Sequence, residues 1–259
     1  MKHGIMHRPT HPTVCISIVS HNQGKLTEVL LSSLEQRCQS SSIMAVVTLN
    51  LEENFSYRHL NLTFPVVIIR NQHPKGFGAN HNFAFTSQCR SDYFCVLNPD
   101  IIFNSNPFPT LLDVLGNPSI GVVSPGLTNS QGELQDNARR FPTVPRIFRR
   151  IIKKGKTKYN LTEKIFYPDW IAGMFMVFPS RIFSKINGFD ERYYMYCEDA
   201  DICRRLKNNG LKTAVSLAVQ AIHNPHRASH RNVRHFWWHI RSLLLFFSQW
   251  CKGDTYGRY

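Results

Sequence analysis

Two groups of carboxylates stand where they could do chemistry. The first is Asp100, which follows the apolar run 93–97 after Asn98 and Pro99. Because proline lacks the N–H that a strand ladder needs, the run predicts a strand that ends here and exposes the carboxylate. Such a carboxylate can bind a hard divalent cation, which in turn can bridge the phosphates of a nucleotide. The same residue types also favour a plain turn, so both interpretations stay open at this point.

The second group is Glu198, Asp199 and Asp201, at the start of a helix predicted over 198–210. One of these carboxylates can act as a general base, which removes a proton within hydrogen-bond reach. Helix capping is the structural alternative, because acidic side chains stabilise the start of a helix. His223 ends an apolar stretch and can offer its imidazole to the same metal as Asp100. A single histidine is more often structural, so it counts only in combination with the carboxylates.

The elements that must position these groups alternate between strands and helices. Strands are predicted at 14–20, 44–49, 65–70 and 93–97, and helices at 25–36 and 78–88. This alternation predicts a mostly parallel sheet that is covered by helices. In such sheets the ligand binds outside the carboxyl ends of the strands. The polar loops at those ends are 19–22, 70–78 and 98–100, so we expect them to converge on one edge, where a nucleotide is the usual occupant.

The second half of the chain has a strand-like segment at 120–124 and a stretch at 213–223 that fits one long strand or a strand pair. Without internal repeats or a low-complexity linker, we predict one domain over residues 1–225 and a tail over 226–259. Within the tail, 235–250 predicts a helix with one apolar face. Its tryptophans, phenylalanines and arginines are typical of an interfacial helix. Docking on the domain's own core is the alternative, and both can hold for different faces.

Charge and cysteine usage limit the partners and the cellular compartment that we expect for this protein. The chain has a formal net charge of +14, and residues 139–159 contain no acidic side chain. This predicts a nearby anionic partner, which is a nucleic acid, an anionic membrane surface or a phosphorylated substrate, unless the stretch is only a solvated loop. No segment has the apolar length of a signal peptide or a membrane span. Seven cysteines without a CxxC pair argue against a disulfide framework and a structural zinc site, which predicts a reducing, cytoplasmic setting.

In combination these motifs identify a family. The chain resembles the inverting nucleotide-sugar glycosyltransferases of family 2, which have the GT-A fold, and in particular their rhamnosyltransferase-like subgroup. The resemblance covers residues 12–225 and rests on VSHN, NQHPKGFGANHNFAF, LNPD, the segment from Trp170 to Gly210, and His223. It implies a Rossmann-like, three-layer α/β/α sandwich with a mostly parallel central sheet, followed by the helical tail.

The resemblance also implies roles for individual residues. LNPD stands where the family carries its DxD metal motif, with Asn98 in place of the first Asp. Asp100 is then expected to hold Mg²⁺ or Mn²⁺ on the donor's diphosphate, with His223 completing the metal site. Asp199 matches the family's catalytic base and Glu198 its neighbour. The donor-binding set is expected to be Ser20, Asn22, Asn50, Asn71, Gly76, Gly78, Asn82, Asn98, Trp170 and Gly173.

The glycines and Trp170 are expected in the donor-binding set for physical reasons. The glycines would let the backbone approach the ligand closely. Trp170 would stack on a sugar face, with a place in the core as the alternative. Asp190 would either bind the acceptor or support the residues that do.

The implied reaction is a single displacement with inversion. A carboxylate takes the proton of an acceptor hydroxyl, and a metal neutralises the charge of the leaving diphosphate. The expected donor is a dTDP- or UDP-sugar, with dTDP-L-rhamnose favoured. The expected acceptor is a glycan or a lipid-linked oligosaccharide in cell-surface polysaccharide synthesis. An anionic membrane surface is the further partner, with the enzyme peripheral at the inner face of the cell membrane, and no specific nucleic acid is expected.

One departure from the family pattern concerns the nucleobase. Many members carry Asp-Asn-x-Ser after the second strand, whereas this chain has VTLNLEEN. Asn50 is the candidate substitute, and the choice between uridine and thymidine donors stays open.

Two other functions compete with a transferase. A nucleic-acid or polyanion-binding protein with a Rossmann-like domain fits the charge and the basic, aromatic tail. It leaves LNPD, the Glu198–Asp199 pair and His223 without a role. A metal-dependent phosphohydrolase with the same pocket would cleave a nucleotide sugar without any acceptor.

Overall fold

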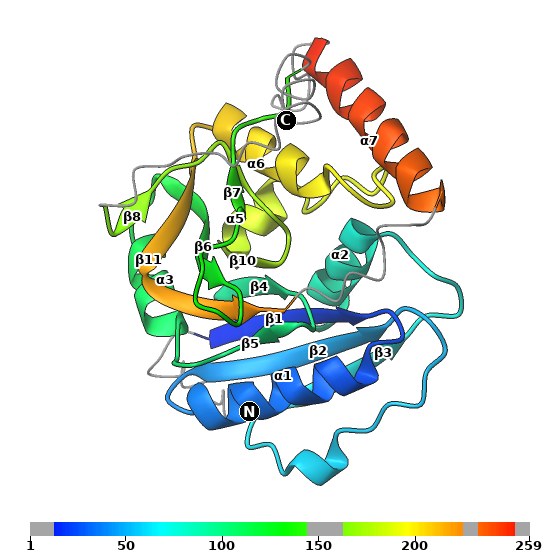
Figure 1. Cartoon of the computed structure of the whole chain (residues 1–259), viewed down its shortest axis with the longest axis vertical. Coiled ribbons are helices and arrows are strands. Elements are labelled where there is room, and N and C mark those ends of the chain that lie inside the picture. Colours follow the sequence, from blue (N-terminus) through cyan, green and yellow to red (C-terminus); the bar gives the residue numbers. More distant parts are fainter. Residues whose placement is uncertain (1–12, 144–162, 225–232, 252–259) are drawn as a thin grey trace, which may run out of the picture.

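The computed structural model describes residues 13–143, 163–224 and 233–251. Its strands are β1 (Thr13–Ser20), β2 (Ser42–Leu49), β3 (Val66–Arg70), β4 (Tyr93–Leu97), β5 (Ile101–Ile102), β6 (Ile120–Thr128), β7 (Ala138–Arg139), β8 (Ile165–Phe166), β9 (Trp170–Ile171), β10 (Phe175–Pro179) and β11 (Lys212–His223). Its helices are α1 (Gly24–Arg37), the 3-10 turn η1 (Arg58–Leu60), α2 (Phe77–Gln88), α3 (Phe108–Leu115), α5 (Ser180–Lys185), α6 (Glu198–Asn208) and α7 (Val233–Cys251) (Figure 1). Most of the basic stretch 139–159 lies outside the described residues.

The main sheet has the strand order β3-β2-β1-β4-β10-β6-β11-β5, with β8 paired to β11. Strands β3, β2, β1 and β4 run parallel, as do β6 and β11, while β10 is antiparallel to both of its neighbours. Nearly every residue of β1, β2 and β4 is buried, as expected for parallel strands that are covered on both faces. The predicted α/β architecture with a mostly parallel sheet is confirmed, and β11 is one long strand.

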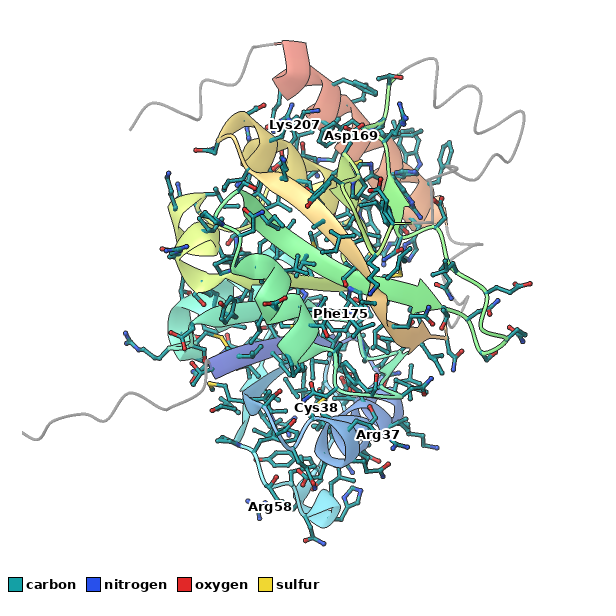
Figure 2. All side chains as sticks on the ribbon, turned by 90° about the vertical axis from the view of Figure 1, so that its left-hand side faces the viewer. Arg37, Cys38, Arg58, Asp169, Phe175 and Lys207 are labelled. Carbon is teal, nitrogen blue, oxygen red and sulfur yellow. A yellow bond between two sulfur atoms is a disulfide. The ribbon has the colours of Figure 1, made fainter. Side chains whose placement is uncertain are left out.

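Helices cover both faces of this sheet, which gives the three layers. On one face, α1 and α3 contribute side chains such as Leu30 and Leu111 to a core cluster. On the other face, α2, α5, α6 and α7 contribute side chains such as Phe183 and Ile202 to a second cluster. Phe175 of β10 belongs to the first cluster and lies deep in the molecule in Figure 2.

The register of the strands brings the polar loops to one edge. β1 and β2 pair as far as Ser20 and Leu49, and Leu49 pairs with Arg70 at the end of β3. The residues that follow β2 and β3 are Asn50 and Asn71, so they leave the sheet beside the end of β1. This edge is the one predicted for the ligand.

The predicted tail helix is present as α7 and is docked on the domain. Phe246 is fully buried in the second core cluster. The Ser242 hydroxyl donates to the Met195 carbonyl at 2.8 Å. The Trp238 and Tyr194 rings lie 4.8 Å apart between centroids. One face of α7 is therefore part of the fold, and Figure 1 shows the helix running along the outside of the molecule. No helix in the described part of the chain is long and apolar enough to cross a membrane.

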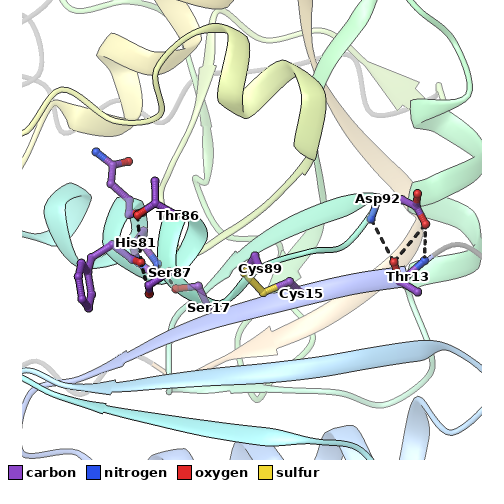
Figure 3. The surroundings of a disulfide bond; sticks show 10 residues. Thr13, Cys15, Ser17, His81, Thr86, Ser87, Cys89 and Asp92 are labelled. Carbon is purple, nitrogen blue, oxygen red and sulfur yellow. Dashed lines mark hydrogen bonds between the residues drawn. A yellow bond between two sulfur atoms is a disulfide. The ribbon is translucent and has the colours of Figure 1, made fainter. Parts of the chain in front are cut away.

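The cysteine prediction needs a correction, because Cys15 and Cys89 form a disulfide (Figure 3). Cys15 lies in β1 and Cys89 directly follows α2, and their Cα atoms are 5.8 Å apart although 74 positions separate them in sequence. Spacing along the chain could not reveal this pair, since α2 brings the two residues together only when it packs back across β1. The described cysteines that stay free are all buried, and they are Cys38, Cys95, Cys197 and Cys203.

Candidate active site

Asp100 and His223 meet because β5 pairs with the end of β11. The register places His223 opposite Ile101, and the Asn224 amide donates to the Asp100 carbonyl at 3.1 Å. The two side chains face each other with His223 Nε2 3.4 Å from Asp100 Oδ2. The structure therefore brings together the two residues that were predicted, 123 positions apart along the sequence, to share a metal.

Gln135 fixes how the imidazole of His223 is presented. Its side-chain nitrogen donates to the His223 carbonyl at 2.7 Å, which turns its oxygen toward His223 Nδ1 at 2.5 Å. Nδ1 is then the donor, so Nε2 presents its lone pair toward Asp100. Two acceptors that face each other in this way suit a cation between them. Sequence analysis missed Gln135, since it lies in a loop without a motif.

The donor set fits Mg²⁺ or Mn²⁺ in part. Asp100 Oδ1 is buried without a hydrogen-bond partner, which is costly unless a ligand completes it. Within residues 13–143, 163–224 and 233–251, no cluster of three or more His, Cys, Asp or Glu side chains has the arrangement of a metal site. Asp100 and His223 would therefore supply two ligands, and phosphate oxygens and water the rest.

Asp199 lies at the start of α6 and is held by two backbone amides. The Gly173 amide donates to its Oδ2 at 3.1 Å and the Ala200 amide to its Oδ1 at 2.8 Å. Met174, the next residue after Gly173, accepts from the Asn98 amide at 2.9 Å. The loop between β9 and β10 thus ties the predicted base to the turn that carries Asp100.

Burial raises the pKa of Asp199, while the charge of Arg139 and the two amides act in the opposite direction. Arg139 lies in β7 and stacks over Trp170, with its guanidinium carbon 5.1 Å from the ring centroid. It also bonds the Asp136 carbonyl at 2.9 Å through Nε. Arg139 is a second residue that sequence analysis did not single out, because it belonged there only to an undivided basic stretch.

The two neighbouring carboxylates differ from Asp199. Burial, and then the charge of Asp199, raises the pKa of Glu198 well above its usual value. Its Oε2 is buried without a partner. Asp201 is fully buried and paired with Arg204 at 3.0 Å and Arg205 at 2.7 Å. Asp201 is therefore structural, and Asp199 is the carboxylate best suited to accept a proton.

The donor-side asparagines form a connected network of amides. Asn50 Oδ1 accepts from Asn71 Nδ2 at 2.8 Å and from the Lys75 amide at 2.8 Å. Asn50 Nδ2 donates to the Lys75 carbonyl at 3.0 Å, and Asn71 Nδ2 also donates to Asn80 Oδ1 at 2.6 Å. Asn50 is thus engaged in holding the loop after β3, with His21 Nδ1 at 3.3 Å from its Nδ2.

The remaining donor-side residues have mixed surroundings. Ser20 is buried, and its hydroxyl accepts from the Gln23 amide at 3.1 Å before α1. Asn22 is exposed in the left-handed conformation with φ 60°. The Asn82 side chain is bound to the Phe189 backbone at both of its ends, at 2.8 Å each. Ser20 and Asn82 therefore shape the loops, and Asn22 is the one of these three that faces solvent.

The predicted glycines and Trp170 make close contacts with the protein itself. A Cβ at Gly76 would lie 2.7 Å from the Tyr194 carbonyl oxygen, and one at Gly78 would lie 2.6 Å from the Phe189 Cβ. Trp170 is 8% exposed, and its ring nitrogen donates to the Arg140 carbonyl at 3.0 Å. Trp170 therefore occupies the core, which was the alternative to sugar stacking.

The match to family models covers most of the chain. The model described as glycosyl transferase family 2 matches residues 15–180, and the model described as the N-terminal domain of galactosyltransferase matches residues 155–231.

Two curated relatives are rhamnosyltransferases by name. The chain is 29% identical over 187 residues to "Rhamnosyltransferase WbbL" of Escherichia coli (strain K12), which covers 67% of this chain and 70% of that protein. It is 26% identical over 174 residues to "N-acetylglucosaminyl-diphospho-decaprenol L-rhamnosyltransferase" of Mycobacterium tuberculosis (strain CDC 1551 / Oshkosh), which covers 62% of this chain and 57% of that protein.

Solved structures share the fold. GalNAc-T7 with UDP, GalNAc and Mn²⁺ matches with a TM-score of 0.64 at 16% identity, over 86% of this chain and 45% of that one. The mannosyltransferase PcManGT from Pyrobaculum calidifontis, in complex with GDP-Man and Mn²⁺, matches with a TM-score of 0.64 at 14% identity. This match covers 95% of this chain and 66% of that one. At these identities the matches concern the GT-A fold alone.

Proposed function

The chain belongs to glycosyl transferase family 2, and from that premise we propose that it transfers a sugar, with inversion, from a nucleotide-diphosphate sugar to a hydroxyl of a glycan or a lipid-linked glycan. The observation that carries the proposal is Asp100, which has an unpaired buried oxygen and His223 beside it. Asp199 is linked to the same turn through the backbone of Gly173 and Met174. The rhamnosyltransferase names of two relatives support dTDP-L-rhamnose as the donor over a UDP-sugar.

The chain's own residues have separate tasks in this reaction. Asp199 accepts the proton of the acceptor hydroxyl as the new bond forms, since it is the ionisable carboxylate held at the site by two amides. Burial and the charge of Asp199 favour the neutral form of Glu198 beside it. Asp100 and His223 would hold Mg²⁺ or Mn²⁺, which supplies charge neutralisation for the leaving diphosphate. The Asn50 and Asn71 network fixes the loop that borders the donor.

The proposed setting is the inner face of a cell membrane, in cell-surface polysaccharide synthesis. The relative from Mycobacterium tuberculosis is named for a diphospho-decaprenol acceptor. A lipid-linked acceptor of that kind would bring this protein to a membrane surface. Its net charge of +14 would favour that location, since cytoplasmic leaflets are anionic.

The experiment is a calorimetric titration of the purified protein with UDP and with dTDP, each with and without Mn²⁺. Metal-dependent binding is expected, and the tighter nucleotide identifies the donor class. The variant Asp100→Ala should lose most of the gain in nucleotide affinity that Mn²⁺ gives the unaltered protein. If neither nucleotide binds at concentrations approaching about 1 mM, the transferase proposal fails, and salt-sensitive binding of RNA would then favour the polyanion-binding alternative.

A further inference from the structure

The outer face of α7 carries an exposed apolar surface. Phe236, Trp237 and Leu244 have 63%, 64% and 66% of their surfaces exposed. In the described part of the chain the other large apolar side chains with high exposure are single residues on other elements, and they are Val29, Phe83 and Tyr167. A group of three on one helix is therefore a feature of α7 rather than of the surface in general.

These side chains form one stripe along the helix. At 100° per residue, Phe236, Trp237 and Leu244 lie on the same side, and the partly exposed Ile240 and Phe247 lie between them. Phe247 also packs against the second core cluster, so it forms the edge of this surface. We call these five residues the α7 stripe. It continues along about three turns of the helix, since it runs from residue 236 to residue 247.

The charged side chains of α7 itself are all basic, and the acidic side chain that contacts the helix, Asp190, does so through Gln249 on the face away from the stripe. Arg234 and Arg241 are exposed on the same helix. No aspartate or glutamate occurs in the sequence from residue 202 to residue 253. An apolar stripe flanked by cations and free of acidic side chains is complementary to an anionic bilayer, with the apolar groups below the headgroups and the cations among them.

The opposite face of α7 holds the helix rigidly on the catalytic domain. Gln249 bonds Arg204 at 3.1 Å, the Ser242 hydroxyl bonds the Met195 carbonyl, and His235 Nδ1 lies 2.8 Å from the Tyr196 hydroxyl. Met195 and Tyr196 belong to the turn that leads into Glu198. The stripe is therefore a fixed surface, whose position relative to the catalytic carboxylates is set by packing.

We propose that the α7 stripe is the surface by which this protein lies on an anionic membrane, with α7 parallel to the bilayer plane. Since α7 is not long and apolar enough to cross the bilayer, it enters only the interfacial layer. The inference rests on the proposed function, because the orientation is useful only if the acceptor is lipid-linked. Such an acceptor would then reach an active site that is held at a constant height above the membrane.

The test is vesicle binding by the full chain without nucleotide. The combined substitution Phe236→Ser, Trp237→Ser and Leu244→Ser should weaken binding to phosphatidylcholine/phosphatidylglycerol vesicles by at least about 10-fold. The matched control combines Val29→Ser, Phe83→Ser and Tyr167→Ser, which removes as many exposed apolar side chains from other elements. It should bind as the unaltered chain does. Vesicles of phosphatidylcholine alone should bind all three proteins weakly.

A second measurement does not depend on the folding of the triple variant. Lipids brominated near the headgroups should quench the fluorescence of the unaltered chain on vesicle binding. Trp237→Phe should bind vesicles nearly as well and show clearly less quenching, since the aromatic anchor stays while one of the three α7 fluorophores, Trp237, Trp238 and Trp250, goes.

Several outcomes would overturn the proposal. They are equal vesicle binding by the stripe variant and the unaltered chain, an equal loss of binding in the matched control, and quenching that Trp237→Phe leaves unchanged. A dimer of the unaltered chain that the stripe substitutions convert to a monomer would also overturn it, by assigning the stripe to self-association. If the chain binds nucleotide with Mn²⁺ but does not bind vesicles, the proposed transferase function stands and only the membrane-binding role of the stripe is wrong.

Discussion

At the scale of single residues, the geometry around Asp199 makes a sharp prediction about catalysis. Its carboxylate accepts from the amides of Gly173 and Ala200. Asp199→Asn preserves the shape of the side chain but removes the ability to accept a proton. We expect kcat to fall by about 10²- to 10⁴-fold, while the calorimetric Kd for the donor nucleotide changes little.

Glu198→Gln is the matched comparison for that variant. Burial and the charge of Asp199 raise the pKa of Glu198 well above its usual value, which favours the neutral form of the side chain. A neutral amide is then a close substitute, and most of the turnover should survive. If Glu198→Gln were as damaging as Asp199→Asn, the role of base would have to be shared or exchanged between the two.

The pH dependence of the reaction follows from the same carboxylate. Burial raises the pKa of Asp199 above its ordinary value of 3.8, and Arg139 opposes this rise. The ionised form is the active base, so kcat/KM should fall as the pH drops through this raised pKa. Arg139→Ala removes the opposing charge, and the acidic limb of the pH profile should move to higher pH.

The control for this shift is Arg140→Ala, which removes an exposed charge that is not among the groups acting on Asp199. The backbone carbonyl that Arg140 offers to Trp170 stays in place. If the acidic limb is unchanged in Arg139→Ala, or moves as far in Arg140→Ala, then the charge of Arg139 does not control the pKa of Asp199.

At the scale of elements, the loop after β3 tests how the donor is bound. Asn50 uses both ends of its amide to hold Asn71 and Lys75, so it acts on the loop rather than on a nucleobase. Asn50→Ala should weaken UDP and dTDP binding by a similar factor, about 5- to 30-fold for one or two lost hydrogen bonds. Calorimetry with both nucleotides measures the two factors.

A change in the ratio of UDP to dTDP affinity would contradict this role and would make Asn50 a base-reading residue. Asn106→Ala is a suitable control, because Asn106 also fixes a loop by side-chain hydrogen bonds, to Ser40 and Ser41. Its partners lie before β2, at the opposite end of that strand from Asn50.

The elements that the sequence predicted well are those with a long, regular pattern. The strands β1 and β4 and the helices α1 and α2 begin and end within two residues of the predicted bounds. Strand β5 was missed, because Ile101–Ile102 is too short for any periodicity, although its pairing with β11 is what brings His223 to Asp100. Gln135 was missed for a related reason, since its partner lies 88 positions away.

At the scale of the whole molecule, the candidate site is assembled from distant parts of the chain. Asp100 follows β4, Asp199 opens α6 and His223 ends β11. Motif order and spacing were enough to predict that Asp100 and His223 lie together, and the place of Asp199 in the same site stays a prediction. They were not enough to distinguish a ligand contact from packing at Trp170 and Gly76, since that distinction depends on which neighbours fill the space.

The disulfide between Cys15 and Cys89 makes the last prediction, which concerns global stability. The cross-link closes a loop across a sequence separation of 74. For a loop of this size the chain-entropy model gives a stabilisation of about 4.5 kcal/mol, and native disulfides typically contribute about 2–4 kcal/mol. Reduction of the unaltered protein should lower its free energy of unfolding in urea by about 2–4 kcal/mol. The variant Cys15→Ala/Cys89→Ala should show a similarly low value that no longer responds to reductant.

Cys95→Ala is the control, because Cys95 is buried in β4 and free, so its variant should keep the full response to reductant. Thiol alkylation and mass spectrometry of protein taken rapidly from cells would show whether the bond forms where the protein works. If Cys15 and Cys89 are alkylated there and reductant leaves the urea midpoint unchanged, the two thiols are merely neighbours in the core. The prediction of a reducing, cytoplasmic setting would then hold. A protected pair would require an oxidising compartment instead, since thiols are kept reduced in the cytosol.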